Sequence, residues 1–377
     1  MNWSIPHTLD ASQIEELRDL AISIQQIPAP TFGEGRRAAY IYKRFQAEHL
    51  KDVTQDSLGN VYGCLPGKGK SPPLVVCAHL DTVFPEATDL TITRSPGKIA
   101  APGIGDNSLG VAALLGLVWA LRKQKATASA LPGDLWLVAN VCEEGLGNLA
   151  GMRAVVEHFA EQVKGYLILE GMALGQIYHR GLGVQRYKIT AETAGGHSWV
   201  DYGKPSAVHE LVALINRLIA IPLAKQPRTT LNIGVVSGGT SVNTIAAQAC
   251  CLLDLRSEQA DALQELSSLV EAMIRDANRP TVRLVGEIVG HRPAGMLPLS
   301  HPMVRLAINC LEVNGIQPHP NIGSTDANLP LSRGLPAICL GLTSGAGAHT
   351  TNEYIETRPL ERGMSQLVEF IQRYYTE

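Results

Sequence analysis

Short, continuously apolar segments alternate with longer amphipathic ones along most of the chain. Four of the apolar segments are strand-length and bounded by proline, glycine or acidic residues: PLVVCAHLD, GDLWLVANVCEE, GYLILEG and LPAICLGL, at residues 73–81, 133–144, 165–171 and 335–342. Strands that are apolar throughout are typical of a mostly parallel sheet covered on both faces by helices. The pattern therefore predicts an α/β architecture.

The first amphipathic segment follows residue 10. Ser12 and Glu15 have the spacing of a capping box, which marks the start of a helix. Apolar residues then fall on one helical stripe, formed by Ile14, Leu17, Leu20, Ala21 and Ile24. We expect a helix here with its stripe in the core.

Between residues 181 and 292 the order of elements changes to strand, helix, strand, strand, helix, strand. The strands are VQRYKITAE, TTLNIGVVSG, AQACCLLDLRS and TVRLVGEIVG, and the two helices carry the apolar stripes Leu211, Leu214, Ile215, Leu218 and Leu263, Leu266, Val270, Ile274. This βαββαβ order matches a ferredoxin-like unit. Because the α/β pattern then resumes, we expect one domain formed by residues 1–180 and 293–377, with residues 181–292 inserted as a second.

Length and charge narrow the range of partners. At 377 residues the chain exceeds what one hydrophobic core usually serves, which agrees with two domains. Its 32 basic and 35 acidic residues give a net charge of −3 and form no long runs. Proteins that bind nucleic acid or anionic membranes usually carry a basic patch. We therefore expect a small molecule or short peptide as partner, and neither nucleic acid nor membrane.

Targeting signals and cysteines point to the cytoplasm. The N-terminal MNWSIPHTLD lacks a basic segment followed by an apolar one, and the most apolar stretch, LGVAALLGLVWAL, is shorter than the ~18 residues that a spanning helix needs. The seven cysteines are scattered without the spacing of a disulfide framework or a thiolate zinc site. A reducing, cytoplasmic location is the expectation.

Ionisable side chains follow each of the four predicted parallel strands. They are His79 and Asp81 after the first, Glu143 and Glu144 after the second, Glu170 at the end of the third, and His349 in the loop TSGAGAHT after the fourth. In open parallel sheets, ligands bind outside the carboxyl ends of the strands. These side chains are therefore expected at one edge of the sheet.

A glycine-rich turn, APGIGDNSLG at residues 101–110, adds Asp106 to the same edge. Its composition resembles a phosphate-binding turn, but Ser108 stands where a dinucleotide fingerprint needs its third glycine, and no Gly-Lys-Ser/Thr follows. Carboxylates gathered without Lys or Arg repel one another and require a cation. The turn is thus expected to hold metal ions.

Imidazole and carboxylate ligands suit zinc, and there are too many for one tetrahedral ion. Two metals about 3.5–4 Å apart, bridged by one carboxylate, would use the set. Asp106 is the candidate bridge, because the glycines around it let the backbone approach the metals.

Taken singly, these residues have ordinary structural explanations. Asp106 could be a helix N-cap and His79 a hydrogen-bonded core histidine. Glu143 and Glu144 could end a solvated strand, and Glu170 could pair with a distant arginine. The metal hypothesis rests on the arrival of such groups at the ends of several strands.

The ordered motifs HLDTV, GIGDNSLG, CEEGLGN, LEG, GGHSW, RPAG and GAHTTNEYI resemble a known family. It comprises the dinuclear zinc aminoacyl-hydrolases and metallopeptidases, among them glutamate carboxypeptidase, acetylornithine deacetylase, succinyl-diaminopimelate desuccinylase, aminoacylase and the tripeptidases. The resemblance extends from about Asp56 to Ile355. It implies a catalytic domain interrupted by a lid domain through which two copies form a homodimer.

The resemblance implies a ligand set for two zinc ions, for which cobalt or manganese can substitute. His79 and Glu170 would bind one ion, His349 and Glu144 the other, and Asp106 both. Asp81 would orient the imidazole of His79. Glu143 would be the base that takes a proton from the bridging water.

Three further positions in the inserted domain resemble functional residues of the family. His197 in AGGHSW matches a lid histidine that donates to the oxyanion, often from the partner subunit. Asn243 in SVNTIA and Arg256 in LDLRS match substrate contacts, and arginine suits a bidentate grip on a carboxylate. Each could instead be structural. Asp326 in GSTDAN resembles a family loop near the site, but no physical role follows for it.

Glu170 bears on the substrate class. In the family pattern, glutamate here accompanies carboxypeptidases and acyl-amino-acid hydrolases, whereas aspartate accompanies aminopeptidases and tripeptidases. We therefore expect cleavage of an N-acyl amino acid or a short peptide with a free carboxylate, with a tripeptidase as the alternative.

Two other classes remain as alternatives. His79-x-Asp81 with a distant histidine also resembles the iron site of mononuclear oxygenases, although those usually have all-β folds. An inactive binding scaffold is the other alternative, but it would have no need of Glu143.

Overall fold

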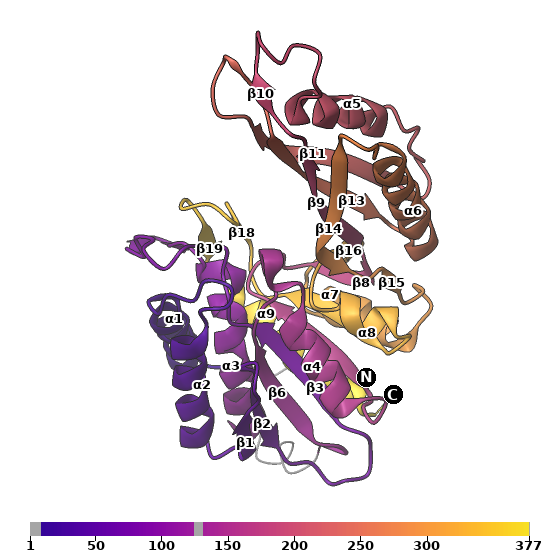
Figure 1. The fold of residues 1–377 in the computed structure, drawn as a ribbon. Helices are drawn as coiled ribbons and strands as arrows, with labels where there is room; N and C mark the ends of the chain where they lie inside the picture. Colours follow the sequence, from indigo (N-terminus) through magenta and orange to yellow (C-terminus); the bar gives the residue numbers. More distant parts are fainter. Residues whose placement is uncertain (1–8, 124–130, 377) are drawn as a thin grey trace. The chain divides into compact units, whose positions relative to one another are not determined.

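The computed structural model describes residues 9–123 and 131–376, which form two compact units (Figure 1). The first unit comprises the chain up to Arg180 and from Met296 onward, and the second is Gly181–Gly295. The sequence placed these boundaries after residues 180 and 292. Most of the N-terminal segment on which the expectation about export rests, residues 1–8, lies outside the described residues.

The first unit is built on a nine-stranded sheet in the order β1-β2-β6-β3-β7-β17-β8-β15, with β16 paired to β8. Its strands are β1 Lys51–Gln55, β2 Val61–Leu65, β3 Leu74–His79, β6 Leu135–Asn140, β7 Gly165–Glu170, β8 Gln176–Gly181, β15 Gly295–Met296, β16 His319–Gly323 and β17 Ala337–Gly341. Strands β6, β3, β7 and β17 are mutually parallel neighbours and correspond to the four apolar segments of the sequence. The α/β prediction is confirmed. The pairs β1–β2, β2–β6 and β17–β8 that flank this centre are antiparallel.

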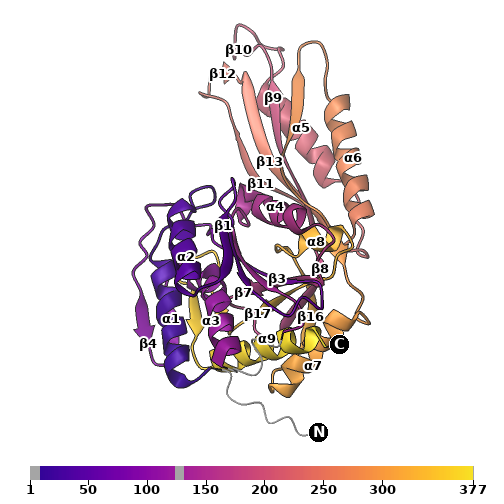
Figure 2. The same cartoon turned by 90° about the horizontal axis from the view of Figure 1, so that it is seen from below.

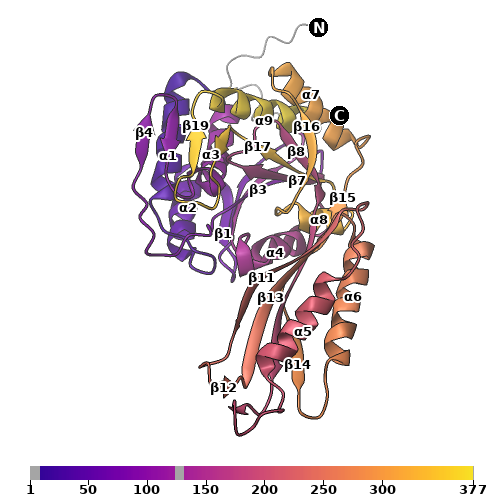
Figure 3. The same ribbon diagram turned by 90° about the horizontal axis from the view of Figure 1, so that it is seen from above.

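Seven α-helices lie in the described part of the first unit, on both faces of this sheet. They are α1 Ala11–Gln25, α2 Gly35–Ala47, α3 Leu109–Lys123, α4 Ala150–Phe159, α7 Pro302–Val313, α8 Asn328–Ser332 and α9 Leu360–Tyr374. Helix α1 packs against α3, α3 against α9, and α9 against α7. Figures 2 and 3 show α9 and α7 on one side of the central strands and α4 and α8 on the other. The parallel strands are therefore covered on both faces, as their apolar sequences require.

The start of α1 differs from its prediction. Asp10 is the N-cap, and its side chain exchanges hydrogen bonds with Gln13 in a capping box two residues earlier than Ser12 and Glu15. Starting the helix at Asp10 places Leu9 and Ile14 at the two positions of a hydrophobic staple, and both are buried. The predicted apolar stripe is buried in full.

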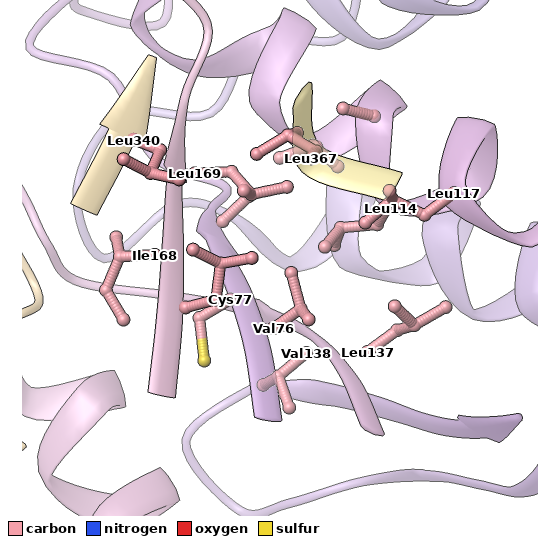
Figure 4. Packing of buried hydrophobic residues seen from close by; sticks show 14 of the residues in the cluster. Val76, Cys77, Leu114, Leu117, Leu137, Val138, Ile168, Leu169, Leu340 and Leu367 are labelled. Carbon is pink, nitrogen blue, oxygen red and sulfur yellow. The ribbon is translucent and has the colours of Figure 1, made fainter. Parts of the chain in front are cut away.

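Helix α3 is the most apolar helix of the first unit's core. The segment Ile104–Lys123 is long and apolar enough to cross a membrane by composition, yet 89% of its most hydrophobic window is buried inside this unit. Figure 4 shows Leu114 and Leu117 of α3 and Leu367 of α9 beside the side chains of the central strands. The apolar character of α3 is accounted for by core packing.

Replacing Leu114 with alanine tests this placement. Leu114 is fully buried, so the substitution should lower the free energy of unfolding by about 2–5 kcal/mol through lost burial and a cavity. Urea unfolding followed by circular dichroism measures the change. Leu58→Ala, at a side chain that is half exposed, should cost no more than about 0.5 kcal/mol. A cost below about 1 kcal/mol for Leu114→Ala would contradict a core position.

The second unit has the elements expected for a ferredoxin-like domain. They are β9 Gly183–Glu192, α5 Ala207–Ile219, β11 Thr229–Gly238, β13 Gln248–Ser257, α6 Ala260–Asp276 and β14 Arg283–Arg292. The four strands form an antiparallel sheet in the order β11-β13-β9-β14. Helices α5 and α6 lie side by side on one face of this sheet (Figure 1), and their predicted apolar stripes lie in the core between helices and sheet.

Two smaller groups of strands lie next to predicted site residues. In the second unit, β10 (Gly196–His197) pairs with β12 (Thr244–Ile245). In the first unit, β18 (Gly345–Ala346), β19 (Tyr354–Glu356), β5 (Lys98–Ala100) and β4 (Thr93–Ser95) form a small sheet in that order. This sheet joins the segment that leads into Asp106 to the segment that contains His349.

Candidate metal centre

The predicted ligands meet at the carboxyl edge of the parallel strands. His79 is the last residue of β3 and Glu170 the last of β7, while Glu144 follows β6 by four residues. The ligand atoms of His79, Asp106 and Glu170 all lie within 4.8 Å of one another, as do those of Asp106, Glu144 and His349. Side chains that are up to 270 residues apart in the sequence thus form two three-membered groups that share Asp106.

Asp106 presents one carboxylate oxygen to each of two histidines. Its Oδ1 lies 3.1 Å from Nε2 of His79, and its Oδ2 lies 3.1 Å from Nε2 of His349. The Nε2 atom of His79 is also 3.7 Å from Glu170, and that of His349 is 3.1 Å from Glu144. A carboxylate between two imidazole nitrogens is the arrangement expected of a group that bridges two metal ions.

The local backbone explains how Asp106 reaches this position. It lies in a short turn, Ile104–Ser108, before α3 begins, and its backbone angles are not helical. The peptide bond between Asp106 and Asn107 is cis. Its two carboxylate oxygens face His79 and His349, so the alternative of a simple N-cap does not describe it.

Carboxylates outnumber imidazoles in this cluster, and the pKa values reflect the imbalance. Burial alone would lower the pKa of His79, but hydrogen bonds to Asp106 and other carboxylates raise it well above its usual value. Hydrogen bonds to Asp106 and a second carboxylate raise the pKa of His349 to about 10. Burial raises the pKa of Glu170 to about 7. The cluster therefore attracts positive charge, either as protons on its imidazoles or as metal cations.

The pKa of Asp106 moves in the opposite direction. Burial favours its neutral form, but the hydrogen bonds from His349 and His79 outweigh burial and lower the pKa below its usual range. The carboxylate of Asp106 is thus held in the charged form that a metal ligand needs.

Asp81 is fully buried behind His79. The imidazole Nδ1 of His79 lies 3.0 Å from the backbone oxygen of Asp81 and 3.5 Å from its carboxylate, and Nε2 points toward Asp106 and Glu170. The same carboxylate accepts the backbone N–H groups of Glu143 and Glu144, both at 2.9 Å. Burial would raise the pKa of Asp81, but the bonds with His79 lower it. Asp81 therefore positions three residues at the ends of two strands, β3 and β6.

Glu143 is buried beside the ligands. One of its carboxylate oxygens lies within 4.8 Å of ligand atoms of His79 and Glu144. It belongs to neither of the two groups that share Asp106. Its carboxylate therefore lies next to the cluster, and its role as the base stays a prediction.

Two buried polar residues were missed by the sequence analysis. Asn107 donates to the backbone oxygen of Leu169 at 2.8 Å and accepts from the N–H of Gly171 at 2.9 Å, so it holds the turn on both sides of Glu170. Glu353, in the motif GAHTTNEYI, accepts three backbone N–H groups from the turn around Asp106. The only feature of the sequence that could have indicated them is that each lies within four residues of a predicted ligand.

Burial raises the pKa of Glu353 to about 7, although the hydrogen bonds from backbone N–H groups to its carboxylate act to lower the pKa. The nearby charge of Asp106 adds to the increase.

Asp326 lies at the same edge of the sheet. It is fully buried, and its carboxylate accepts a hydrogen bond of 2.7 Å from Asn140, the last residue of β6. Its charge contributes to the raised pKa of Glu170. The structure places Asp326 close to the cluster but outside the groups of candidate ligands.

His197 and Asn243 lie together in the second unit. His197 pairs with Thr244 across β10 and β12, and the backbone oxygen of Asn243 accepts from the N–H of Ser198 at 3.1 Å. The Nδ1 atom of His197 accepts the N–H of Trp199 at 3.2 Å. A neutral imidazole that accepts at Nδ1 carries its proton at Nε2. His197 therefore presents an exposed hydrogen-bond donor.

Arg256 is not near these two residues. It lies on β13 opposite Val184, seven residues beyond Ala249, which at ~3.3 Å per residue is roughly 23 Å along the strand. Ala249 pairs with Gly238 at the end of the sheet that leads to β12. The guanidinium of Arg256 bonds to Asp254 at 2.7 Å. The structure thus separates the two predicted substrate contacts of this unit.

Comparison with known proteins identifies relatives over most of the chain. The sequence model described as Peptidase family M20/M25/M40 matches residues 75–373. A succinyl-diaminopimelate desuccinylase from Corynebacterium glutamicum is 25% identical over 360 residues, covering 93% of this chain and 94% of that protein.

Solved structures show the same fold. A tripeptidase from Staphylococcus aureus has a TM-score of 0.80 at 21% identity, covering 97% of this chain and 99% of that one. A dinuclear metal-binding peptidase from Bacillus subtilis has a TM-score of 0.70 at 17% identity, with the same two coverages. The fold is therefore shared with these proteins.

Proposed function

The chain belongs to the peptidase family M20/M25/M40, and from this membership we propose that it is a metal-dependent hydrolase that cleaves the amide bond of an N-acyl amino acid or short peptide. The observation that carries the proposal is the position of Asp106, with one carboxylate oxygen at each of two histidines. The desuccinylase from Corynebacterium glutamicum, a relative along nearly the whole chain, supports an N-acyl amino acid as substrate.

The donor set fits two zinc ions. We assign His79 and Glu170 to one ion, His349 and Glu144 to the other, and Asp106 to both, in agreement with the two groups of ligand atoms. Nitrogen and carboxylate oxygen donors suit zinc, and cobalt or manganese would be held by the same set. When bound, the ions lower the pKa of a water toward ~7 and polarise the carbonyl of the substrate.

Glu143 supplies the proton transfers. Its carboxylate lies beside the ligands without belonging to either group that shares Asp106, so it is placed to accept a proton from the attacking water. Once protonated, it can donate the proton to the leaving nitrogen. Asp81 fixes the backbone of Glu143 and so sets the direction from which the base acts.

The second unit supplies a donor for the oxyanion in this proposal. His197 presents its Nε2–H, because Nδ1 is used by the N–H of Trp199. We propose that two copies pair through this unit, whose edge strand β11 exposes Val235 and Val236. Asn243 and Arg256 stay predicted substrate contacts. Because they lie toward opposite ends of the sheet, the two residues would have to contact different parts of the substrate or different substrate molecules.

A cytoplasmic location also stays a prediction. All seven cysteines lie in the described residues and are free thiols, which is compatible with a reducing compartment.

A substrate panel separates the proposal from its alternative. The zinc-loaded protein is expected to release amino acids from N-acetyl and N-succinyl amino acids and from dipeptides with a free carboxylate. Tripeptides with a free amine should be poor substrates by comparison. Release of products is followed by chromatography, with heat-denatured protein as the blank. Efficient cleavage of tripeptides alone would favour the tripeptidase alternative.

Metal removal tests the hydrolytic chemistry. Dialysis against a chelator should abolish turnover, and two equivalents of zinc, cobalt or manganese per chain should restore it, because the ions supply the activated water. Metal content is measured by atomic emission alongside activity. Full activity at less than 0.1 equivalent of metal per chain would rule the mechanism out, and a purified protein that holds one iron instead of two zinc ions would favour the oxygenase alternative.

A further inference from the structure

The loop that carries His349 is exposed along its whole length. Each residue from 344 to 352 is exposed, and the side chain of His349 itself is 55% exposed. Such a loop has few packing contacts of its own to fix a ligand. Glu353 is the first buried residue after it, with no exposed surface.

The buried carboxylate of Glu353 is bound to the turn that contains Asp106. Its Oε1 accepts from the N–H groups of Gly105 at 2.7 Å and Asp106 at 2.8 Å, and its Oε2 accepts from the N–H of Gly103 at 3.0 Å. The backbone oxygen of Glu353 accepts from Ala101 at 3.0 Å. One residue therefore satisfies four backbone donors in residues 101–106.

The turn is shaped so that a carboxylate can reach these donors. Gly103 has a φ of 73°, a conformation that glycine adopts without strain. A Cβ atom on Gly105 would lie 2.5 Å from Met172 and 2.9 Å from Ile355. The two glycines thus let the backbone turn its N–H groups inward to a single acceptor.

The contact joins two predicted ligands of one metal ion. Asp106 donates its own backbone N–H to Glu353, and Glu353 follows His349 by four residues. The side chains of Asp106 and His349 meet at 3.1 Å on the other side of this contact. Asn107 joins the turn to the end of β7. Glu353 joins the same turn to the exposed loop that carries His349.

We propose that Glu353 is a positioning residue of the metal centre, whose carboxylate sets the distance between Asp106 and His349 by binding the turn of residues 103–106. The inference rests on the metal site proposed above. Glu353 does not touch the metal ions or the substrate in this proposal. Its removal should therefore weaken metal binding and alter the coordination geometry, and leave the fold intact.

Two substitutions disturb these hydrogen bonds, one by removing the carboxylate and one by shortening the side chain. Glu353→Gln keeps the shape but places an NH2 group against backbone N–H donors, which leaves at least one of them without an acceptor. Glu353→Asp keeps the charge but is one methylene too short to reach all three N–H groups. Glu356→Gln is the matched control, because Glu356 lies on the same segment and bonds to Ser344 and Thr343 through its backbone, which the substitution keeps.

The test compares zinc affinity by competition titration with a chromophoric chelator. Both Glu353 variants are expected to bind their weaker equivalent of zinc about 10–100-fold less tightly than the wild type, while Glu356→Gln binds as the wild type does. The visible absorption spectrum of the cobalt-loaded protein should change in both Glu353 variants. Wild-type affinity and spectrum in either variant would overturn the proposal.

Hydrogen exchange in the metal-free protein gives a result that does not depend on hydrolysis. The amides of Gly103, Gly105 and Asp106 should exchange at least about tenfold faster in Glu353→Gln, with a thermal midpoint close to that of Glu356→Gln. If amide exchange is unchanged, Glu353 does not hold the turn, whatever the substrate. If exchange and zinc affinity change in a protein that cleaves no amide, the positioning role stands and the proposed hydrolysis fails.

Discussion

Replacing Glu143 with glutamine is expected to lower kcat by about 10²–10⁴-fold, the usual contribution of a general base. Glutamine has nearly the same shape, so it should fit the buried space beside His79 and Glu144. It cannot accept a proton from water at neutral pH. The backbone N–H of residue 143 keeps its bond to Asp81, and the ligands of both proposed ions are untouched. Turnover should therefore fall while the variant still binds two equivalents of zinc.

Measured kcat, KM and zinc content together decide the role of Glu143. A fall in kcat with zinc content unchanged identifies a group needed for chemistry and not for metal binding. Glu161→Gln, at an exposed glutamate of the same unit, should match the wild type in all three. A Glu143→Gln variant that keeps more than about a tenth of the activity would show that another group is the base.

Replacing Asp106 with alanine should have an even broader effect, because both groups of candidate ligands lose a member. The two remaining pairs, His79 with Glu170 and His349 with Glu144, would each have to hold an ion with two protein ligands. Loss of metal catalysis worth several kcal/mol corresponds to roughly 10³-fold or more in kcat/KM. Zinc bound after gel filtration should fall well below two equivalents per chain.

Thermal unfolding provides the control for Asp106→Ala. A ligand that binds only the folded state stabilises it by about 2.7 kcal/mol at a hundred times its dissociation constant. The wild type should gain thermal stability from added zinc, and the variant should lose most of that gain. The variant should retain a cooperative transition without metal. His349→Ala removes a ligand from one group only, so it should keep one tightly bound ion. A variant of Asp106 that binds two ions as the wild type does would exclude bridging.

Much of the candidate centre follows from the sequence because parallel strands share a carboxyl edge. His79 and Glu170 end short apolar segments that the pattern predicts as buried parallel strands, so their meeting at one edge is a consequence of topology. Asp106 could be placed with them because its turn opens a helix that follows the same strands. Local pattern was sufficient for these three residues.

Contacts between distant loops could not be predicted in this way. Glu353 meets the turn of Asp106 across 247 residues, and nothing in its own segment indicates which backbone groups it will accept. The start of α1 shows the same limit on a smaller scale. Asp10 with Gln13 and Ser12 with Glu15 are both capping sequences, and burial of Leu9 decides between them.

Arg256 shows why a motif does not define a site. Its position in LDLRS fits a strand, but register places it opposite Val184, at the end of the sheet away from the loop of Asn243. A shared role for the two residues would need them within reach of one small substrate. The length of β13 keeps the two residues apart. This separation follows from the register of β13 with its neighbouring strands, which the sequence does not show.

The most direct test of the whole account is a crystal structure of the zinc-loaded protein with anomalous diffraction data collected at the zinc edge. We predict two anomalous peaks about 3.5–4 Å apart, with Asp106 between them, His79 and Glu170 on one and His349 and Glu144 on the other. A single peak, or peaks bound by other residues, would contradict the dinuclear centre and the hydrolytic function built on it.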